Sequence, residues 1–158
     1  MRELILLRHA HAEPGAEGQA DVERPLSRQG LAEAEAAGRW LKEHRYLPDR
    51  VIVSPARRTR ETLEEVLKQL GYVEQRQEQR IYEATPGTLM QVADELRDTP
   101  RLMLVGHNPG LEQMVALLSS GQSGEFRGMP AGGIAVLHLP ADAALEPGLA
   151  RLAAFWWP

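Results

Sequence analysis

The amino-acid sequence predicts an α/β fold in which helices cover a mostly parallel sheet. Residues 4–7, 51–53 and 102–105 form short apolar runs without polar interruption, which is typical of strands buried on both faces. Segments with the apolar spacing of amphipathic helices follow each run. The 158 residues are enough for one domain with its own core, and we expect a single domain over residues 1–158.

The first two helices can be bounded from their capping residues. Apolar positions keep helical spacing from Arg28 to about His44, and Ser27 is a natural N-cap for this helix. A second apolar stripe covers residues 63–70, and Gly71 after it is a natural C-terminal stop.

Three helices are predicted to start in the same way. Ser54-Pro55, Thr85-Pro86 and Asn108-Pro109 each pair a capping side chain with a proline at the first helical position. The last two pairs precede apolar stripes over residues 89–96 and 111–118. Two apolar segments of the tail, 134–139 and 152–157, flank a turn with Pro and Gly, and we expect them to form a hairpin.

Composition excludes several kinds of function. The net charge of -4 argues against a general binder of nucleic acid or of anionic membranes. The absence of cysteine excludes disulfides, zinc–thiolate sites and thiol nucleophiles. The N-terminal apolar stretch is too short for a signal peptide, and none approaches the roughly 20 apolar residues of a membrane-spanning helix. We therefore expect a cytoplasmic protein that binds neither nucleic acid nor membrane.

Candidate functional residues follow the predicted strands. Ligands of open α/β sheets bind beyond the carboxyl ends of the strands. Arg8 and His9 follow the first strand, residues 54–58 the second, and His107 a later one. Two helix N-termini are expected to point toward the same edge, where their N–H groups favour an anion. Histidine, arginine and helix N-termini at one place predict a site for a phosphoryl group.

Taken one at a time, these residues also have ordinary structural interpretations. An Arg-His pair after a strand is weak evidence, and His107 alone could be a loop histidine that bonds the backbone. Other residues are interpreted as structural or as parts of a solvated face: Arg57, Arg60, His44, His138, Trp156 and Trp157. The prediction therefore depends on the groups being close together.

Four segments resemble the histidine phosphatase superfamily. Residues 6–10 resemble its strand that runs into Arg-His-Gly, with Ala10 at the usual glycine position. Residues 54–62 resemble its Ser-Pro-x-x-Arg-Ala-x-x-Thr segment, in which Arg58 is the matching arginine. Residues 105–109 resemble the segment with the second catalytic histidine, and residues 23–30 the Arg-Pro-Leu-Thr-x-x-Gly segment of the SixA-type branch. The likeness extends from residue 4 to about residue 118.

This resemblance implies a three-layer α/β/α sandwich with a mostly parallel central sheet. It implies that His9 is the catalytic nucleophile, that Arg8 and Arg58 bind the phosphoryl group, and that His107 is a further donor to its oxygens. Arg24 is expected to reach the phosphate from the loop after the first strand. The chain lacks the long insertion of larger members, which argues for a compact phosphatase and against a phosphoglycerate mutase.

The residues themselves indicate how the chemistry would proceed. For His9 to attack phosphorus, one ring nitrogen must be unprotonated and the other should donate to an acceptor such as a backbone carbonyl. Guanidinium groups match the phosphate oxygens better than ammonium groups do. Glu83, just before the third helix, is a candidate proton donor. It can equally be an acidic residue that the helix dipole favours.

The expected function is hydrolysis of a phosphoryl group, with a phosphohistidine-containing signalling protein as substrate and no metal or other cofactor. One alternative is a phosphatase of small phosphomonoesters, and another is a non-catalytic module that binds phosphoproteins. A metal hydrolase is a third alternative, since His9 and His11 with Glu13 nearby could form a ligand pair. No second ligand cluster follows in the sequence, and the arginines would repel a cation.

Overall fold

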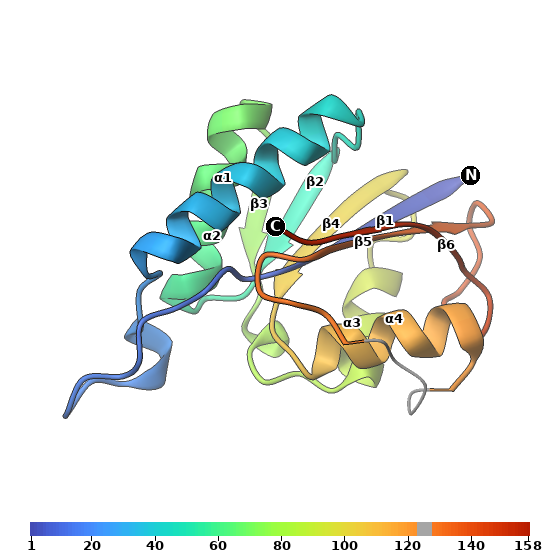
Figure 1. Cartoon of the computed structure of the whole chain (residues 1–158). Helices are drawn as coiled ribbons and strands as arrows, with labels where there is room; N and C mark the ends of the chain where they lie inside the picture. The colour runs from blue at the N-terminus through green and yellow to red at the C-terminus, as the bar shows by residue number, and fades with distance from the viewer. Residues whose placement is uncertain (123–127) are drawn as a thin grey trace.

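A six-stranded mixed sheet forms the centre of the computed structural model, which describes residues 1–122 and 128–158 (Figure 1). The strands lie in the order β3-β2-β4-β1-β5-β6. Their bounds are β1 (Arg2–Arg8), β2 (Arg50–Val53), β3 (Glu74–Gln77), β4 (Arg101–Gly106), β5 (Ile134–Leu139) and β6 (Arg151–Trp156). The first four run parallel to one another, whereas β5 is antiparallel to β1 and to β6.

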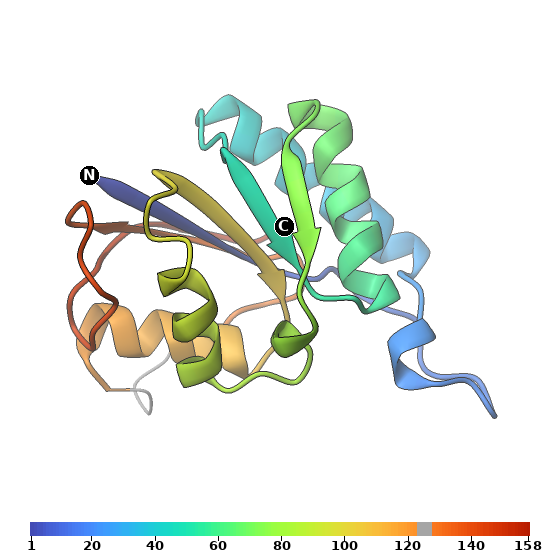
Figure 2. The same cartoon turned by 180° about the vertical axis from the view of Figure 1, so that it is seen from behind.

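Two pairs of helices cover the two faces of this sheet. The four are α1 (Arg28–Glu43), α2 (Arg57–Leu70), α3 (Pro86–Asp94) and α4 (Gly110–Ser120). Figures 1 and 2 show α1 and α2 on one face and α3 and α4 on the other. The predicted α/β class, with three layers and a mostly parallel sheet, is confirmed. No helix in the described ranges is both long and apolar enough to cross a membrane.

Alternate side chains of β1 pack in two separate hydrophobic cores, one on each face of the sheet. Leu4 and Leu6 pack among the residues of α3 and α4, whereas Ile5 and Leu7 pack among those of α1 and α2. All four side chains are fully buried. Burial on both faces explains why this strand, like β2 and β4, appears in the sequence as an uninterrupted apolar run.

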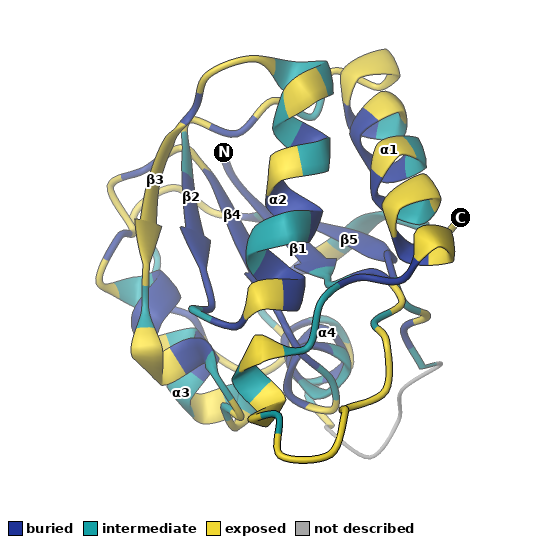
Figure 3. Cartoon of the chain, turned by 90° about the vertical axis from the view of Figure 1, so that its left-hand side faces the viewer, coloured by how far each residue is buried: buried dark blue, intermediate teal, exposed yellow. Residues whose placement is uncertain are grey.

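Strand β3 was not predicted, because its sequence has no apolar residue. All four of its residues are exposed, and Figure 3 shows it in yellow beside the dark blue of β2 and β4. It is the edge strand, held by parallel backbone pairing with β2 from Arg50↔Glu74 to Val53↔Gln77. The predicted hairpin of the tail is confirmed by the antiparallel pairing of β5 with β6.

The helix starts agree with the predictions in two cases and differ in two. Ser27 caps α1 through the N–H of Gly30, and Thr85 caps α3 through the N–H of Thr88. The predicted starts at Ser54-Pro55 and Asn108-Pro109 are wrong, because α2 begins at Arg57 and α4 at Gly110. Their N-cap residues are Ala56 and Pro109, which make no side-chain capping bond.

Side-chain hydrogen bonds explain the two late starts. The Ser54 hydroxyl accepts from the N–H of Ala56 and forms a turn before α2, and it also contacts His107. Asn108 accepts from the N–H of Glu112, within the first turn of α4, and its amide donates to the carbonyl of Met129. Both side chains therefore organise loops at the sheet edge.

Gly30 allows the loop after β1 to pack closely on α1. A Cβ at this position would overlap the carbonyl oxygen of His11, which accepts from the N–H of Ser27.

We expect Gly30→Ala to lower the free energy of unfolding by about 2 kcal/mol, because the backbone must shift. Gly87→Ala in α3 is the control: its Cβ would lie 3.9 Å from the nearest atom, Thr85 Oγ1, so stability should change by no more than about 1 kcal/mol. Urea unfolding measures both, and equal stabilities would contradict the packing argument.

Candidate active site

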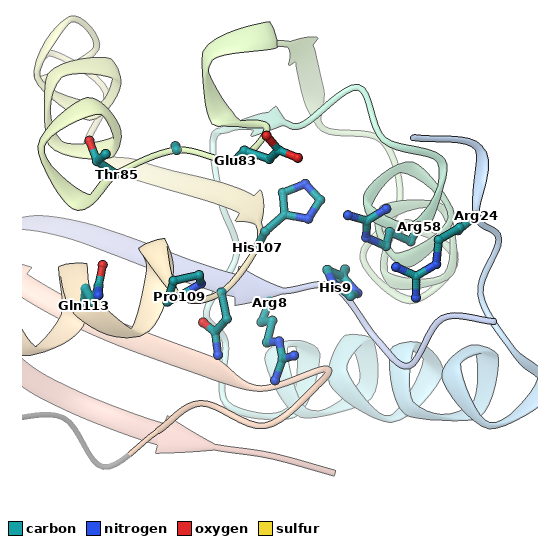
Figure 4. A pocket seen from close by; sticks show the side chains of 11 residues that line it. Arg8, His9, Arg24, Arg58, Glu83, Thr85, His107, Pro109 and Gln113 are labelled. Carbon is teal, nitrogen blue, oxygen red and sulfur yellow. The ribbon is translucent and has the colours of Figure 1, made fainter. Parts of the chain in front are cut away.

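A pocket of about 570 Å³ lies at the edge of the sheet where β1 and β4 end (Figure 4). All six residues predicted for the site line it: Arg8, His9, Arg24, Arg58, Glu83 and His107. The wall is completed by Ala84, Thr85, Asn108, Pro109 and Gln113. Segments from five distant parts of the sequence therefore meet at one space.

Pairing of β1 with β4 brings the two histidines together. The strands are parallel neighbours whose register ends at Arg8↔Gly106, so the next residue of each is a histidine. The backbone N–H of His9 donates to the carbonyl of Gly106 at 3.0 Å. The ring centroids of His9 and His107 are 5.3 Å apart.

The ring of His9 is held in one tautomer. Its Nδ1 lies 2.7 Å from the carbonyl oxygen of Ala10, and because a carbonyl can only accept, Nδ1 carries the proton. Nε2 has no hydrogen-bond partner in the part of the chain that the structure describes. Burial, together with Arg58 and Arg8, lowers the pKa of His9 to about 4. At neutral pH the ring is uncharged and Nε2 has a free lone pair.

His107 is also uncharged at neutral pH. Burial, together with the neighbouring His9 and Arg58, lowers its pKa to about 3. Its Nε2 lies 2.8 Å from the hydroxyl oxygen of Ser54, a residue that is fully buried. The ring of Tyr82 lies on a further side, at 5.5 Å between centroids.

Arg58 is bound to an acidic residue that sequence reasoning missed. Its Nη1 donates to the backbone carbonyl of Asp21 at 2.9 Å, and its Nη2 donates to the Asp21 carboxylate at 3.1 Å. Arg24 donates to the same carboxylate at 3.1 Å. The hydroxyl of Tyr82 is a further donor to it. The hydrogen bond from Tyr82, with those from Arg24 and Arg58, holds the pKa of the Asp21 carboxyl well below its usual range.

No sequence signal pointed to Asp21 or Tyr82. Asp21 lies in the 3-10 helix η1 (Asp21–Glu23), within a polar loop, and Tyr82 directly follows η2 (Gln79–Ile81). Neither residue is part of an amphipathic stripe. Only the arginines that they contact could have indicated that an anionic partner was needed.

Arg8 lines the pocket and has one buried donor without a partner within the described ranges. Its Nη1 donates to the carbonyl of Met129 at 2.7 Å. Its Nε is buried and has no hydrogen-bond partner among the described residues. Burial also lowers the pKa of the Arg8 guanidinium. A buried N–H without an acceptor is costly.

Glu83 lies on the pocket wall in a strained backbone conformation. Its φ of 55° falls in the left-handed region, which residues other than glycine rarely adopt. The side chain is exposed and lines the pocket together with His107 (Figure 4). Backbone strain of this kind is common at functional sites.

Several of the other predicted surface or structural residues have contacts outside the pocket. Arg57 pairs with Glu61, and Arg60 donates to the carbonyl of Pro55. His11, which with His9 forms the alternative metal-ligand pair, has a different contact. Its Nδ1 lies 2.6 Å from the hydroxyl of Ser27. Over residues 1–122 and 128–158, no three His, Cys, Asp or Glu side chains are grouped so that they could hold a metal ion.

Comparison with known proteins agrees with this geometry. The sequence matches the histidine phosphatase superfamily (branch 1) over residues 4–126, which include His9, Arg58 and His107. The chain belongs to this superfamily. As a histidine phosphatase, it is an enzyme that acts on a phosphorylated substrate.

Relatives of this histidine phosphatase include members of the SixA-like branch. An uncharacterized protein of Mycobacterium tuberculosis is 34% identical over 163 residues, covering 96% of this chain and 99% of the relative. The phosphohistidine phosphatase SixA of Escherichia coli is 36% identical over 64 residues, 40% of this chain and 38% of SixA. The crystal structure of a candidate SixA from Agrobacterium tumefaciens has a TM-score of 0.86 at 28% identity, covering 99% of this chain and 98% of that one. The resemblance to this branch is therefore confirmed.

The lowered pKa values of this histidine phosphatase predict a loss of stability in acid. The folded protein keeps His9 and His107 neutral down to about pH 4 and pH 3, whereas the unfolded chain protonates both near 6.5. The unfolded state binds more protons in this interval, so the free energy of unfolding falls as the pH falls below about 6.5. Between pH 7 and pH 5 we expect a loss of about 1.5 kcal/mol for each of the two histidines.

Urea unfolding of His107→Gln at pH 7 and pH 5 measures the effect. The variant should lose about 1.5 kcal/mol less than the wild type over this interval. Gln113→Ala, which removes a non-titrating side chain of the same pocket, should keep the wild-type dependence. Identical pH dependence in His107→Gln and the wild type would contradict the lowered pKa of His107.

Proposed function

We propose that this histidine phosphatase hydrolyses protein-borne phosphohistidine, without a metal ion, through a phosphohistidine intermediate on His9. The observation that carries the proposal is the tautomer of His9. Its Nδ1–H donates to the carbonyl of Ala10, so the free lone pair is on Nε2, and this ring lines a pocket with three arginines. A neutral, oriented imidazole among cations suits nucleophilic attack on a phosphoryl group.

The reaction has two displacement steps at phosphorus. In the first, the Nε2 lone pair of His9 forms a bond to phosphorus while the bond to the leaving nitrogen breaks, and its electron pair leaves with that nitrogen. In the second, water attacks the same phosphorus and the bond to His9 breaks. Inorganic phosphate and neutral His9 remain, and the water protons not kept by phosphate pass to the leaving group or solvent.

The surrounding donors stabilise the charge that spreads over the phosphoryl oxygens during transfer. Arg8 and His107 line the pocket, and they are assigned a guanidinium donor and a ring nitrogen donor, respectively. Asp21 holds Arg58 and Arg24 in place through hydrogen bonds from both. Preorganised donors of this kind cost no reorganisation when the charge develops.

A phosphohistidine substrate suits the position of the acid. Glu83 is exposed on the wall and strained. An imidazole leaving group needs less help from an acid than an alkoxide does, because its P–N bond is already labile. The identity of 36% with the E. coli phosphohistidine phosphatase SixA over 64 residues supports the same substrate class.

Small phosphomonoesters are the second candidate substrates. The observation in their favour is that Glu83 lines the same pocket as His9 and could protonate a leaving oxygen. Thr85 and Gln113 add polar groups to the lining of this pocket.

Trapping the intermediate tests the nucleophile and separates catalysis from mere phosphate binding. Chelator-treated protein incubated with phosphoramidate should carry one phosphate on His9, detected by mass spectrometry, and should keep full activity because no step uses a metal. His9→Ala should lose both the label and at least about a thousandfold in kcat. His44→Ala is the control, since His44 bonds the carbonyl of Trp40 outside the pocket and should leave activity unchanged. Equal turnover by His9→Ala would refute the proposed nucleophile.

Replacement of Glu83 separates the two substrate classes. Glu83→Gln should slow hydrolysis of an alkyl phosphomonoester by about a hundredfold, because the leaving oxygen loses its acid. Hydrolysis of a phosphohistidine protein should change by no more than about threefold, because its leaving nitrogen needs less protonation. Steady-state kinetics on both substrates measures the ratio. A large loss on the phosphohistidine protein would contradict the proposed substrate.

A further inference from the structure

Ser54 lies beneath the pocket and is held rigidly at the end of β2. It is 0% exposed, and its backbone N–H donates to the carbonyl of Val105 in the neighbouring strand at 3.1 Å. Its own carbonyl accepts from the hydroxyl of Thr59 at 2.8 Å. The serine hydroxyl is thus fixed directly after the end of β2, beside the ring of His107, which directly follows β4.

The hydrogen bonds of Ser54 indicate which way its hydroxyl donates. The oxygen accepts from the N–H of Ala56 at 3.3 Å and lies 2.8 Å from Nε2 of His107. Among the described residues, Nε2 is the one acceptor that the hydroxyl proton can reach. If Nε2 instead donated to Ser54, the buried hydroxyl proton would have no acceptor, which folded proteins rarely tolerate.

The direction of this hydrogen bond decides what His107 offers to the pocket. A neutral imidazole carries one N–H, and the nitrogen that accepts from a donor leaves the proton on the other nitrogen. His107 is neutral at physiological pH because burial lowers its pKa. Its Nδ1 has no partner in the described part of the chain, and the ring lines the pocket (Figure 4).

We infer that Ser54 is a positioning residue whose hydroxyl fixes the ring proton of His107 on Nδ1, so that His107 donates to a phosphoryl oxygen. In the opposite tautomer, Nδ1 would present a lone pair to an anion and repel it. His9 has the complementary arrangement, since its Nδ1 carries the proton and its Nε2 the lone pair. One histidine is thereby set as nucleophile and the other as donor. The role of His107 in catalysis rests on the proposed function, whereas the position of its ring proton does not.

Nitrogen-15 spectra of the histidine side chains test the tautomer directly. In long-range ¹H–¹⁵N correlation spectra of the full chain at pH 7, protonated and unprotonated ring nitrogens of neutral imidazole differ widely in chemical shift. The signals of His107 are assigned by their loss in His107→Gln. The wild type should show the proton on Nδ1. A proton on Nε2 in the wild type overturns the inference without any variant.

Replacement of Ser54 tests whether its hydroxyl sets the tautomer. Ser54→Ala should shift the His107 proton toward Nε2, weaken binding of inorganic phosphate, and lower kcat on a phosphohistidine protein by about a hundredfold, the effect of losing one preorganised donor. Ser54→Cys replaces the hydroxyl by a weaker thiol donor, so it should give an intermediate tautomer ratio and an intermediate rate. Ser54→Ala with the wild-type tautomer and wild-type kcat overturns the inference.

A matched control separates positioning from general damage to the turn. Thr59→Val removes another fully buried hydroxyl, at the start of α2, and that hydroxyl donates to the backbone carbonyls of Ser54 and Ala56 and not to His107. It should lower stability and keep the proton on Nδ1. A shift toward Nε2 in Thr59→Val as large as that in Ser54→Ala contradicts a specific role for Ser54. A wild type with the proton on Nδ1 but no turnover refutes the phosphatase proposal alone.

Discussion

The parallel pairing of β1 with β4 is the constraint on which the site depends. Both strands are buried on both faces, and their register ends at Arg8↔Gly106. The next residue of each strand is a histidine, so the distance between the two rings follows from the hydrogen bonds of the sheet. The two rings, 5.3 Å apart, are therefore positioned by buried, hydrogen-bonded strands.

Burial and charge act together on these rings. Removal from water and nearby guanidinium groups lower the pKa of both histidines. Neutral His9 therefore keeps a lone pair on one ring nitrogen, and neutral His107 can donate only from the nitrogen that carries its proton. The cations themselves are balanced in part by Asp21, which accepts from Arg58, Arg24 and Tyr82. The pocket thus attracts an anion and still holds its arginines in fixed positions.

The sequence predicted the residues whose role depends on their own strand or motif. It missed the roles that depend on contacts with distant segments. Continuous apolar runs identified β1, β2 and β4, and the motifs after them identified the residues that line the pocket. The polar edge strand β3 has no such pattern, because backbone pairing alone holds it. Ser54 was interpreted as a helix cap, and Asp21 was missed, because the partners of both lie far away in the sequence. Sequence patterns record local preferences, whereas these two roles arise from tertiary contacts.

The pocket is built from two kinds of segment. Its floor, with Arg8, His9 and His107, lies at the ends of β1 and β4, whereas Glu83, Thr85 and Gln113 come from a loop and from helix termini or surfaces. Substitutions in the wall leave the hydrogen-bonded floor intact. Side chains of the wall can therefore be varied to test which leaving groups the pocket accepts, which makes this scaffold a suitable starting point for engineering phosphatases of altered selectivity.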